Sequence, residues 1–525
     1  MSRQISRRTL FRAGLAGAGA VATAGVAVPL GLNWRGTSSA GVLLRSGRAL
    51  PEPYQQPLVI PPVLRPTRTD GTTDYYEITQ RVADAELIPG VRTPIWGYNG
   101  IFPGPTLVSR SGRRTVVKHR NELPVPAVVH LHGGHTPPEF DGYPIDFILP
   151  VGAKDDSAWG GMATHLHGAL HQGERQYEYP LDQRAATLWY HDHRMDYTGA
   201  SVWRGLAGFH LVHDDEEGVL GLPAEGRDLP LMIVDRSFAA DGTLQYPALD
   251  PTMAKQPGVR NAYASGVLGD AILVNGVLWP YAEVPAVRHR LRLLNASNAR
   301  RYRLVLDPPP PGGKGFVQIG SDGGLLDRPV THDAIEFASA ERFDVVVDFG
   351  RYNPGQRVNL VNELGAGSTR QVMQFRVGAK ATDDSRVPDV LSSTPALAPA
   401  SATVQRDFTF RTGSVGAMTG WLTNGKPFDP HRYDAMPKLG DTEIWQFQSD
   451  FHHPIHLHLV QFKVISRNNK EPGVYDAGWK DTVDLKPNEQ VQVITRFTGY
   501  RGRYVFHCHN LEHEDMAMMA NFVTT

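Results

Sequence analysis

Short apolar runs separated by polar turns recur along almost the whole chain. The stretches TLVSRSGRRTVVKHRNEL, AVVHLHGG and TLWYHDH predict strands, and two of these strands end in histidines. Similar runs continue from LPLMIVDRSF to QVMQFRVG. Periodic helical stretches are scarce, and 53 glycines and 40 prolines supply many turns. We therefore predict an all-β fold made of sandwiches of short strands.

A chain of 525 residues is too long for one hydrophobic core. The runs divide it into a leader at 1–40, a first sandwich at 41–216 and a second at 217–380. A Pro-, Ser- and Ala-rich stretch at 381–402 predicts a linker to a third sandwich at 403–525. Histidine clusters occur in the first and third segments, so the second is expected to be structural.

The leader predicts export. Two arginines in SRRTLFR precede a weakly apolar, Ala- and Gly-rich run, which is typical of a twin-arginine signal with cleavage near Ala40. We expect a secreted, periplasmic or cell-envelope protein. A membrane anchor is the alternative, but the Gly, Ala and Thr content makes stable insertion unfavourable. The net charge of −1 gives no reason to expect nucleic-acid binding.

The single cysteine lies among potential metal ligands, in HCHNLEHEDMAMM. One cysteine cannot form an internal disulfide, so Cys508 is either an inert thiol or a reactive group. A thiolate, two imidazoles and a weakly bound thioether form a blue-copper site. Cys508, His513 and Met518 can supply three of these ligands, and His453 in HHPIHLH can supply the fourth.

Four motifs contain a histidine pair with i, i+2 spacing, and one of these pairs flanks Cys508. On a strand, both members of such a pair point to one face. The pair that flanks Cys508 therefore points away from the thiolate, where a second metal site could lie. Eight imidazoles are enough for a cluster of three coppers; they are His130, His132, His191, His193, His456, His458, His507 and His509.

The four motifs HLHG, WYHDH, HPIHLH and HCHNLEHEDMAMM resemble those of the multicopper oxidases. The stretches ILVNGVLWPYAEV, IGSDGGLL, ERFDVVVDF and GWKDTV resemble the branch that contains bacterial spore-coat laccase and bilirubin oxidase. The resemblance spans residues 55–525 and implies three cupredoxin-like Greek-key β-sandwich domains. It implies copper as the cofactor, with one type 1 ion, one type 2 ion held by His130 and His456, and a type 3 pair held by the other six paired histidines.

The resemblance also implies an activity. Small aromatic reductants, such as phenols, aminophenols or bilirubin-like pyrroles, would give single electrons to the blue copper at an exposed edge of His513. Electrons would pass through Cys508 to His507 and His509, and dioxygen would be reduced to water. Glu514 and Asp141 match acids that supply protons in this branch, although either could instead orient a histidine. We expect a monomer.

Two other functions stay open at this stage. A cuprous or ferrous ion oxidase would have the same ligands, but the chain has only 11 methionines, and the local group Met516, Met518 and Met519 lies inside the ligand motif. A copper-free exported scaffold would have lost ligands, whereas all ten histidines, Cys508 and Met518 are present. The tetrapeptide HLHG occurs a second time at 165–168, within an apparent insertion at 151–175. There His165, His167 and His171 either bind an extra metal or bind nothing.

Overall fold

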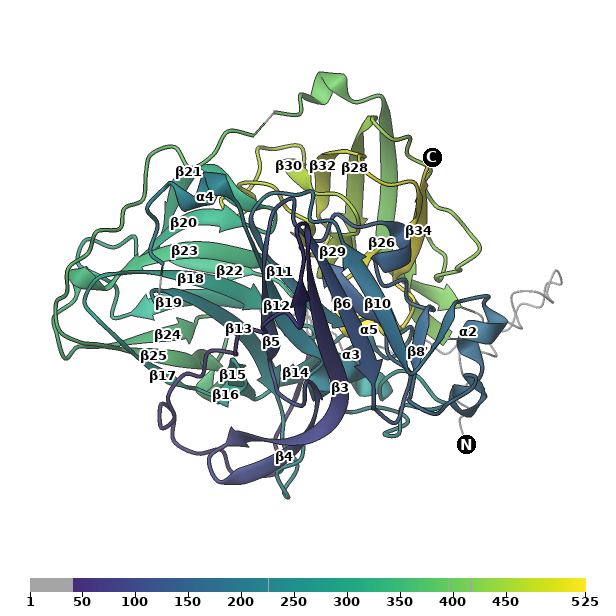
Figure 1. The fold of residues 1–525 in the computed structure, drawn as a ribbon, viewed down its shortest axis with the longest axis horizontal. Coiled ribbons are helices and arrows are strands. Elements are labelled where there is room, and N and C mark those ends of the chain that lie inside the picture. The colour runs from purple at the N-terminus through teal and green to yellow at the C-terminus, as the bar shows by residue number, and fades with distance from the viewer. Residues whose placement is uncertain (1–40, 225, 395, 416–417) are drawn as a thin grey trace.

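Paired β sheets make up most of the structure, a computed structural model that describes residues 41–525 apart from 225, 395 and 416–417 (Figure 1). The predicted export signal at 1–40 lies outside the described residues. The sheets form three two-layered sandwiches along the chain, so the predicted all-β class is confirmed. Among the described helices, none has the length and apolar character needed to cross a bilayer.

The first sandwich packs two sheets around one aromatic-rich core that contains Tyr177, Leu188 and Tyr190. Its strands alternate buried and more exposed positions where one face meets solvent, as in ERQYEY. One sheet has the order β10 (Glu174–Tyr179), β6 (Arg114–Asn121), β3 (Thr73–Ile88), β2 (Arg68–Thr69), with β4 (Val91–Tyr98) also paired to β3. The other has the order β5 (Gly104–Arg110), β12 (Ala207–His213), β11 (Ala186–Asp192), β7 (Val129–His132).

The second sandwich has the most extensive apolar core, and its strands are almost continuously buried, as in β18. One sheet has the order β16 (Val277–Leu278), β15 (Ala271–Val274), β13 (Asp228–Arg236), β18 (Arg288–Asn295), β23 (Arg342–Asp348), β20 (Phe316–Ser321), β21 (Gly324–His332). The other has the order β17 (Tyr281–Val284), β25 (Gln371–Val377), β24 (Arg357–Asn362), β19 (Tyr302–Asp307), β22 (Ala334–Phe337).

The third sandwich encloses Trp445, Phe506 and Cys508 in one core. One sheet has the order β27 (Met418–Thr423), β26 (Val404–Val415), β28 (Thr442–Ser449), β32 (Gln490–Arg496), β30 (Phe462–Arg467). The other has the order β31 (Thr482–Leu485), β29 (His453–Leu457), β33 (Gly502–Cys508), β34 (Met519–Thr524). Parallel pairs such as β26–β28 require a connection that leaves the sheet and returns, as expected for Greek-key sandwiches rather than simple meanders.

Short elements join these sandwiches. The described helices are all short: α2 (Met162–His165), α3 (Thr198–Arg204), α4 (Asp215–Gly218) and α5 (Leu511–Asp515). Two small parallel pairs, β1 (Val42–Leu44) with β14 (Val267–Gly269) and β8 (Phe147–Leu149) with β9 (Leu170–Gln172), complete the described strands. The stretch predicted as a linker is held against the second sandwich, because Asp383 pairs with Arg288 and Leu391 is buried beside Ile319.

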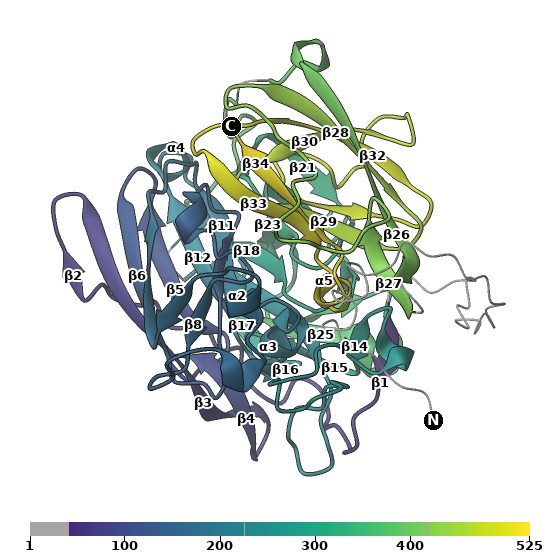
Figure 2. The same ribbon diagram turned by 90° about the vertical axis from the view of Figure 1, so that its right-hand side faces the viewer.

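Strands from the two ends of the chain meet. Figure 2 shows the yellow strand β33 beside β11, and the ring nitrogens of His507 on β33 and His193 just after β11 lie 3.3 Å apart. A contact between ring nitrogens of His130 and His456, 3.4 Å apart, confirms this junction of the first and third sandwiches.

Candidate copper centres

The histidine pairs lie at the ends of buried strands, as the apolar runs predict. In the first sandwich β7 pairs with β11, so that His130 faces His191. In the third, β29 pairs with β33, so that His456 faces His507. All eight paired histidines are at most 1% exposed. Side chains on these strands alternate between faces, which places both members of each pair on the side where the two sandwiches meet.

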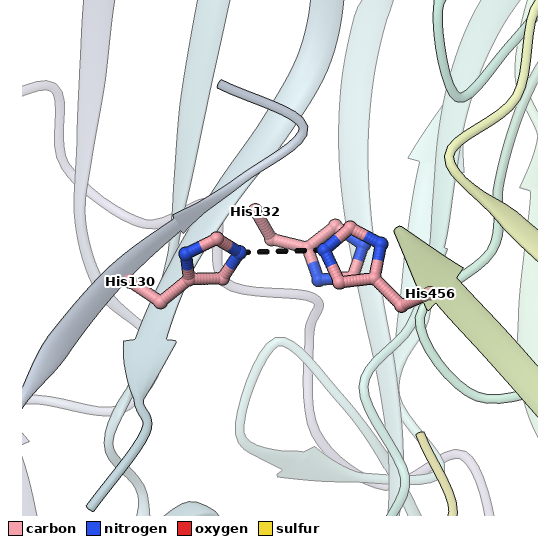
Figure 3. A group of neighbouring side chains, drawn as sticks. All are labelled: His130, His132 and His456. Carbon is pink, nitrogen blue, oxygen red and sulfur yellow. Dashed lines mark hydrogen bonds between the residues drawn. The ribbon is translucent and has the colours of Figure 1, made fainter. Parts of the chain in front are cut away.

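These imidazoles gather into groups that combine both sandwiches. Figure 3 shows the first group, in which His130 and His456 approach each other and His132 stacks on His456 at 3.6 Å between ring centroids. Two further groups each place their ligand atoms within 4.8 Å of one another; they are His132, His191, His509 and His193, His458, His507. The structure thus brings His130 and His456 together and gathers the other six paired histidines beside them in two groups of three.

A separate group surrounds the cysteine. The Cys508 Sγ lies 3.5 Å from Nδ1 of His453 and 3.6 Å from Nδ1 of His513. The same two nitrogens are 3.1 Å apart. Met518 is buried in the same core, and its backbone carbonyl accepts a hydrogen bond from the Cys508 N–H. The four residues predicted for a blue-copper site are therefore neighbours.

The spacing of these atoms fits a shared metal ion. Two nitrogens at about 2.0–2.1 Å and a sulfur at about 2.3 Å from one tetrahedral ion lie about 3.3 Å (N to N) and about 3.6 Å (S to N) apart, taking bond lengths typical of zinc. The observed separations are 3.1–3.6 Å. Among the described residues, both nitrogens of His509 and Nε2 of His191 are buried without a hydrogen-bond partner. Since burying such atoms unpaired is costly, the donor set fits bound metal.

Burial keeps these side chains in the form that binds a metal. It lowers the pKa of His191 to about 3 and that of His193 to about 4, so both are neutral near pH 7. Burial also holds the pKa of His509 well below its usual range. The same effect raises the pKa of the Cys508 thiol, which a bound cation would reverse by stabilising the thiolate.

The two predicted proton donors, Glu514 and Asp141, both contact Nδ1 atoms of the clustered histidines. Glu514 lies 3.2 Å from Nδ1 of His507 and 3.5 Å from Nδ1 of His193. It also accepts a 2.7 Å hydrogen bond from the Thr198 hydroxyl. Burial raises the pKa of this carboxyl, but the two imidazoles and the hydrogen bonds from His507 and Thr198 outweigh it and lower the pKa to about 2. Glu514 is therefore ionised before any metal binds.

Asp141 is in a different state. Its carboxylate lies 2.7 Å from Nδ1 of His458, and its backbone carbonyl lies 2.6 Å from Nδ1 of His130. Burial holds the pKa of Asp141 well above its usual range. Both acids therefore lie at the Nδ1 atoms of clustered histidines, whereas the Nε2 atoms of these histidines face the other imidazoles. Such contacts fix the orientation of a metal-bound imidazole.

Sequence reasoning missed the part that the second sandwich plays in the cluster. Asp481 contacts His132 Nε2 at 3.0 Å, and its backbone carbonyl lies 2.9 Å from His456 Nδ1. Arg342 of β23 holds the Asp481 carboxylate with two N–H groups. It also donates to the Thr187 carbonyl of β11, so one side chain touches all three sandwiches. The sequence showed only that this arginine lies in a family-like stretch, ERFDVVVDF.

The second HLHG copy has a different setting. It begins at the last residue of α2, on the surface, where His165 and His167 are exposed and His171 is half-buried. Among the described residues, the groups of potential metal ligands include none of these three. The two copies thus differ because the first completes a buried strand at the sandwich junction and the second lies in an exposed insertion.

The expectation of an exposed His513 edge is wrong. His513 has no exposed surface. Its outer Nε2 lies 3.2 Å from the Ser265 carbonyl of the second sandwich, and the Trp421 indole stacks on its ring. The sequence could not predict this cover, because Ser265 lies 248 residues away along the chain.

Comparisons with known proteins agree with this architecture. Profiles of the multicopper oxidase family match residues 81–159, 154–217 and 394–525. The chain is 36% identical to a laccase of Bacillus subtilis over 89% of this chain and 98% of that protein. It is 34% identical to a bilirubin oxidase of Albifimbria verrucaria over 90% of this chain and 81% of that protein.

A crystal structure of a laccase from Pediococcus acidilactici superposes with a TM-score of 0.78 at 33% identity, covering 92% of this chain and 96% of that one. The chain therefore belongs to the multicopper oxidase family, and its sandwiches are cupredoxin-like. It is a copper-binding, laccase-like oxidoreductase, and the alternative of a metal-ion oxidase is not favoured.

Proposed function

We propose that the protein binds four coppers and couples one-electron oxidation of small aromatic reductants to reduction of dioxygen to water. One observation carries the proposal: eight buried imidazoles converge where the first and third sandwiches meet, next to the group of Cys508, His453 and His513. His130 and His456 would hold the type 2 ion. The other six paired histidines would hold the type 3 pair, and Met518 would complete the type 1 site.

The chain itself connects the two groups of ligands. Bound copper supplies single-electron transfer at the cysteine site and reduction of dioxygen at the histidine cluster. Cys508 points into the third sandwich, whereas His507 and His509 on either side of it point to the cluster. Covalent bonds of three consecutive residues therefore join the sites, and no solvent or second molecule is needed between them.

The two acids would manage protons at the cluster. Glu514 is ionised and can receive a proton through the Thr198 hydroxyl, to which it is hydrogen-bonded at 2.7 Å. Burial raises the pKa of Asp141 well above its usual range, so it is a candidate donor on the side of His458. Reduction of dioxygen consumes protons, and a positioned acid speeds such transfer by about 100-fold or more.

The names of the relatives support the choice of reductant. The curated relatives include laccases and a bilirubin oxidase, so phenols, aminophenols and bilirubin-like pyrroles are the substrates that we propose. We further propose export through the twin-arginine leader, a location outside the cytoplasm, and a monomeric state.

Metal analysis and spectroscopy test the proposal. Copper-loaded protein should contain four coppers per chain and show an intense blue absorption from the Cys508 thiolate, because thiolate bonding defines this type of copper site. A steady-state screen with a phenol, an aminophenol, bilirubin, cuprous and ferrous ions would then rank the reductants. About one copper per chain, or a colourless loaded protein, would refute the four-copper assignment.

A further inference from the structure

The Trp421 indole covers the outer face of the cysteine-containing site, with the Phe451 ring beside it. The Trp421 indole stacks on the His513 imidazole with 3.7 Å between ring centroids and 27° between planes. His513 has no exposed surface, whereas 7% of the Trp421 surface is exposed. Trp421 is therefore the outermost member of a stack whose inner member faces the Cys508 sulfur at 3.6 Å.

Strand pairing and hydrogen bonds hold the two rings of the stack in place. Trp421 lies on β27, the edge strand of its sheet, in register with Thr412 of β26. Its indole N–H donates a 2.8 Å hydrogen bond to the Ala264 carbonyl of the second sandwich. The next carbonyl, that of Ser265, lies 3.2 Å from His513 Nε2. Two consecutive carbonyls of one loop thus fix both rings and close the edge of His513 to a reductant.

We propose that Trp421 is an electron-relay residue. A reductant would contact the indole instead of His513, and its electron would cross the stacked rings to the copper site. For a phenol, one electron leaves for the cupric ion, the O–H proton passes to bulk water, and a phenoxyl radical is released. The indole is neither oxidised nor consumed, since it supplies only the aromatic contact through which the donor and the ligand communicate.

The proposal has a consequence for specificity. A donor that reaches this site meets the aromatic face that Trp421 presents over His513. Aromatic donors that stack on an indole would gain contact area and favourable ring geometry. Donors would thus be selected by their reduction potential and flatness more than by their shape.

The test compares Trp421→Phe, which keeps an aromatic ring, with Trp421→Leu, which keeps only apolar bulk. Trp159→Leu is the matched control, because its indole also donates to the carbonyl of a neighbouring loop, that of Pro124 at 3.0 Å, and it lies in the exposed insertion. Reduction is followed without oxygen, as bleaching of the blue band in stopped flow. A redox titration gives each variant's potential, so that rates are compared at equal driving force over a series of phenols.

If Trp421 relays electrons, Trp421→Leu slows bleaching by about tenfold or more, the scale on which a lost contact at a reacting centre acts, while Trp421→Phe stays close to wild type. If Trp421 is only a cover, Trp421→Leu uncovers His513 and bleaching becomes as fast or faster, which overturns the proposal. Equal slowing in Trp421→Phe and Trp421→Leu also overturns it, because aromatic character would then be irrelevant.

A second readout does not depend on turnover. Copper added to the metal-free protein should quench the emission of an indole that touches a copper ligand. The quenched fraction should shrink in Trp421→Leu, where the contribution of Trp189, which stacks on His191, remains, and it should be unchanged in Trp159→Leu. Unchanged quenching in Trp421→Leu would contradict the stack. The proposal rests on the copper site of the proposed function. Absence of a blue band in the wild type would refute that site, whereas a blue band with unaltered kinetics in Trp421→Leu refutes the relay alone.

Discussion

Arg342 is the side chain through which the second sandwich controls the histidine cluster. All five of its N–H donors are used: three go to the backbone carbonyls of Thr187, Ala340 and Asp322, and two to the Asp481 carboxylate. Burial raises the pKa of Asp481, but Arg342 outweighs this effect and holds it well below its usual range. The ionised carboxylate can then accept from His132.

Replacing Arg342 by Met would leave Asp481 buried without its cation. The side chains of Arg342 and Asp481 are 1% and 2% exposed, so solvent cannot substitute for the lost partner. Breaking such a buried pair costs about 3–5 kcal/mol. At about 2–4 °C per kcal/mol for a domain of this size, the melting transition of the copper-free protein that disrupts this pair should fall by about 6–20 °C. The orientation of His132 should also relax, which weakens copper binding by about 10- to 100-fold.

A matched variant separates stability from copper binding. Arg290→Met removes a guanidinium that is likewise buried and paired, with Asp344 and Glu217, and among the described ion pairs these two carboxylates contact none of the clustered histidines. Calorimetry should give similar losses for both variants, whereas copper titration should show weaker binding only for Arg342→Met. Arg342→Lys should recover part of the stability but not the orientation, because an ammonium group cannot reproduce the two-pronged contact. Equal copper affinity in Arg342→Met and Arg290→Met would refute the reasoning.

Three further predictions concern single sites. His130→Ala should lose the type 2 electron paramagnetic resonance signal and turnover, whereas His165→Ala with His167→Ala should keep both; the reverse result would assign the metal to the second HLHG copy. The Glu514→Gln variant should still form the blue site and accept electrons without oxygen. Its reoxidation in aerated buffer, followed by stopped flow, should slow by about tenfold or more. Reoxidation at the wild-type rate would remove Glu514 from the proton path. Burial lowers the pKa of His135, but the Asp182 carboxylate outweighs this effect and raises the pKa above its usual value. The stabilisation that protonated His135 gives the fold is therefore complete below the unfolded pKa of about 6.5, and it is lost as pH rises through the folded pKa. The melting temperature of His135→Gln should thus fall below wild type at pH 5.5 and match it at pH 8.5, and a constant difference would contradict this assignment.

Local pattern was enough to predict the strands that carry the ligands. The runs before His130 and through His191 are buried strands that end at the sandwich junction, as β7 and β11 show. Alternation along a strand also explains why Cys508 and its two neighbours face opposite sides. Which histidines share a metal could not be derived from spacing, because His130 and His456 are 326 residues apart. That grouping came from the resemblance to a known family.

The contacts that sequence reasoning missed are those made between sandwiches. Arg342 looks like any polar residue on a strand, and its role depends on where Asp481 of another sandwich lies. The prediction of an exposed His513 edge was wrong for the same reason, because the backbone carbonyl of Ser265 and the Trp421 indole of an edge strand cover this ring. A backbone carbonyl carries no sequence signal, because every residue has one.

Removal of copper should show how strongly the metal joins the sandwiches. The histidine groups take ligands from the first and third sandwiches, so metal bound there stabilises only the assembled state. An ion present at about 100 times its dissociation constant adds about 2.7 kcal/mol per site. We therefore expect copper-free protein to unfold at lower temperature and in separable steps, since each sandwich has its own core. Loaded protein should unfold in fewer steps at higher temperature in scanning calorimetry. Identical traces with and without copper would mean that the junction is held by packing and by ion pairs such as that of Arg342 and Asp481, and that the histidine cluster is preformed.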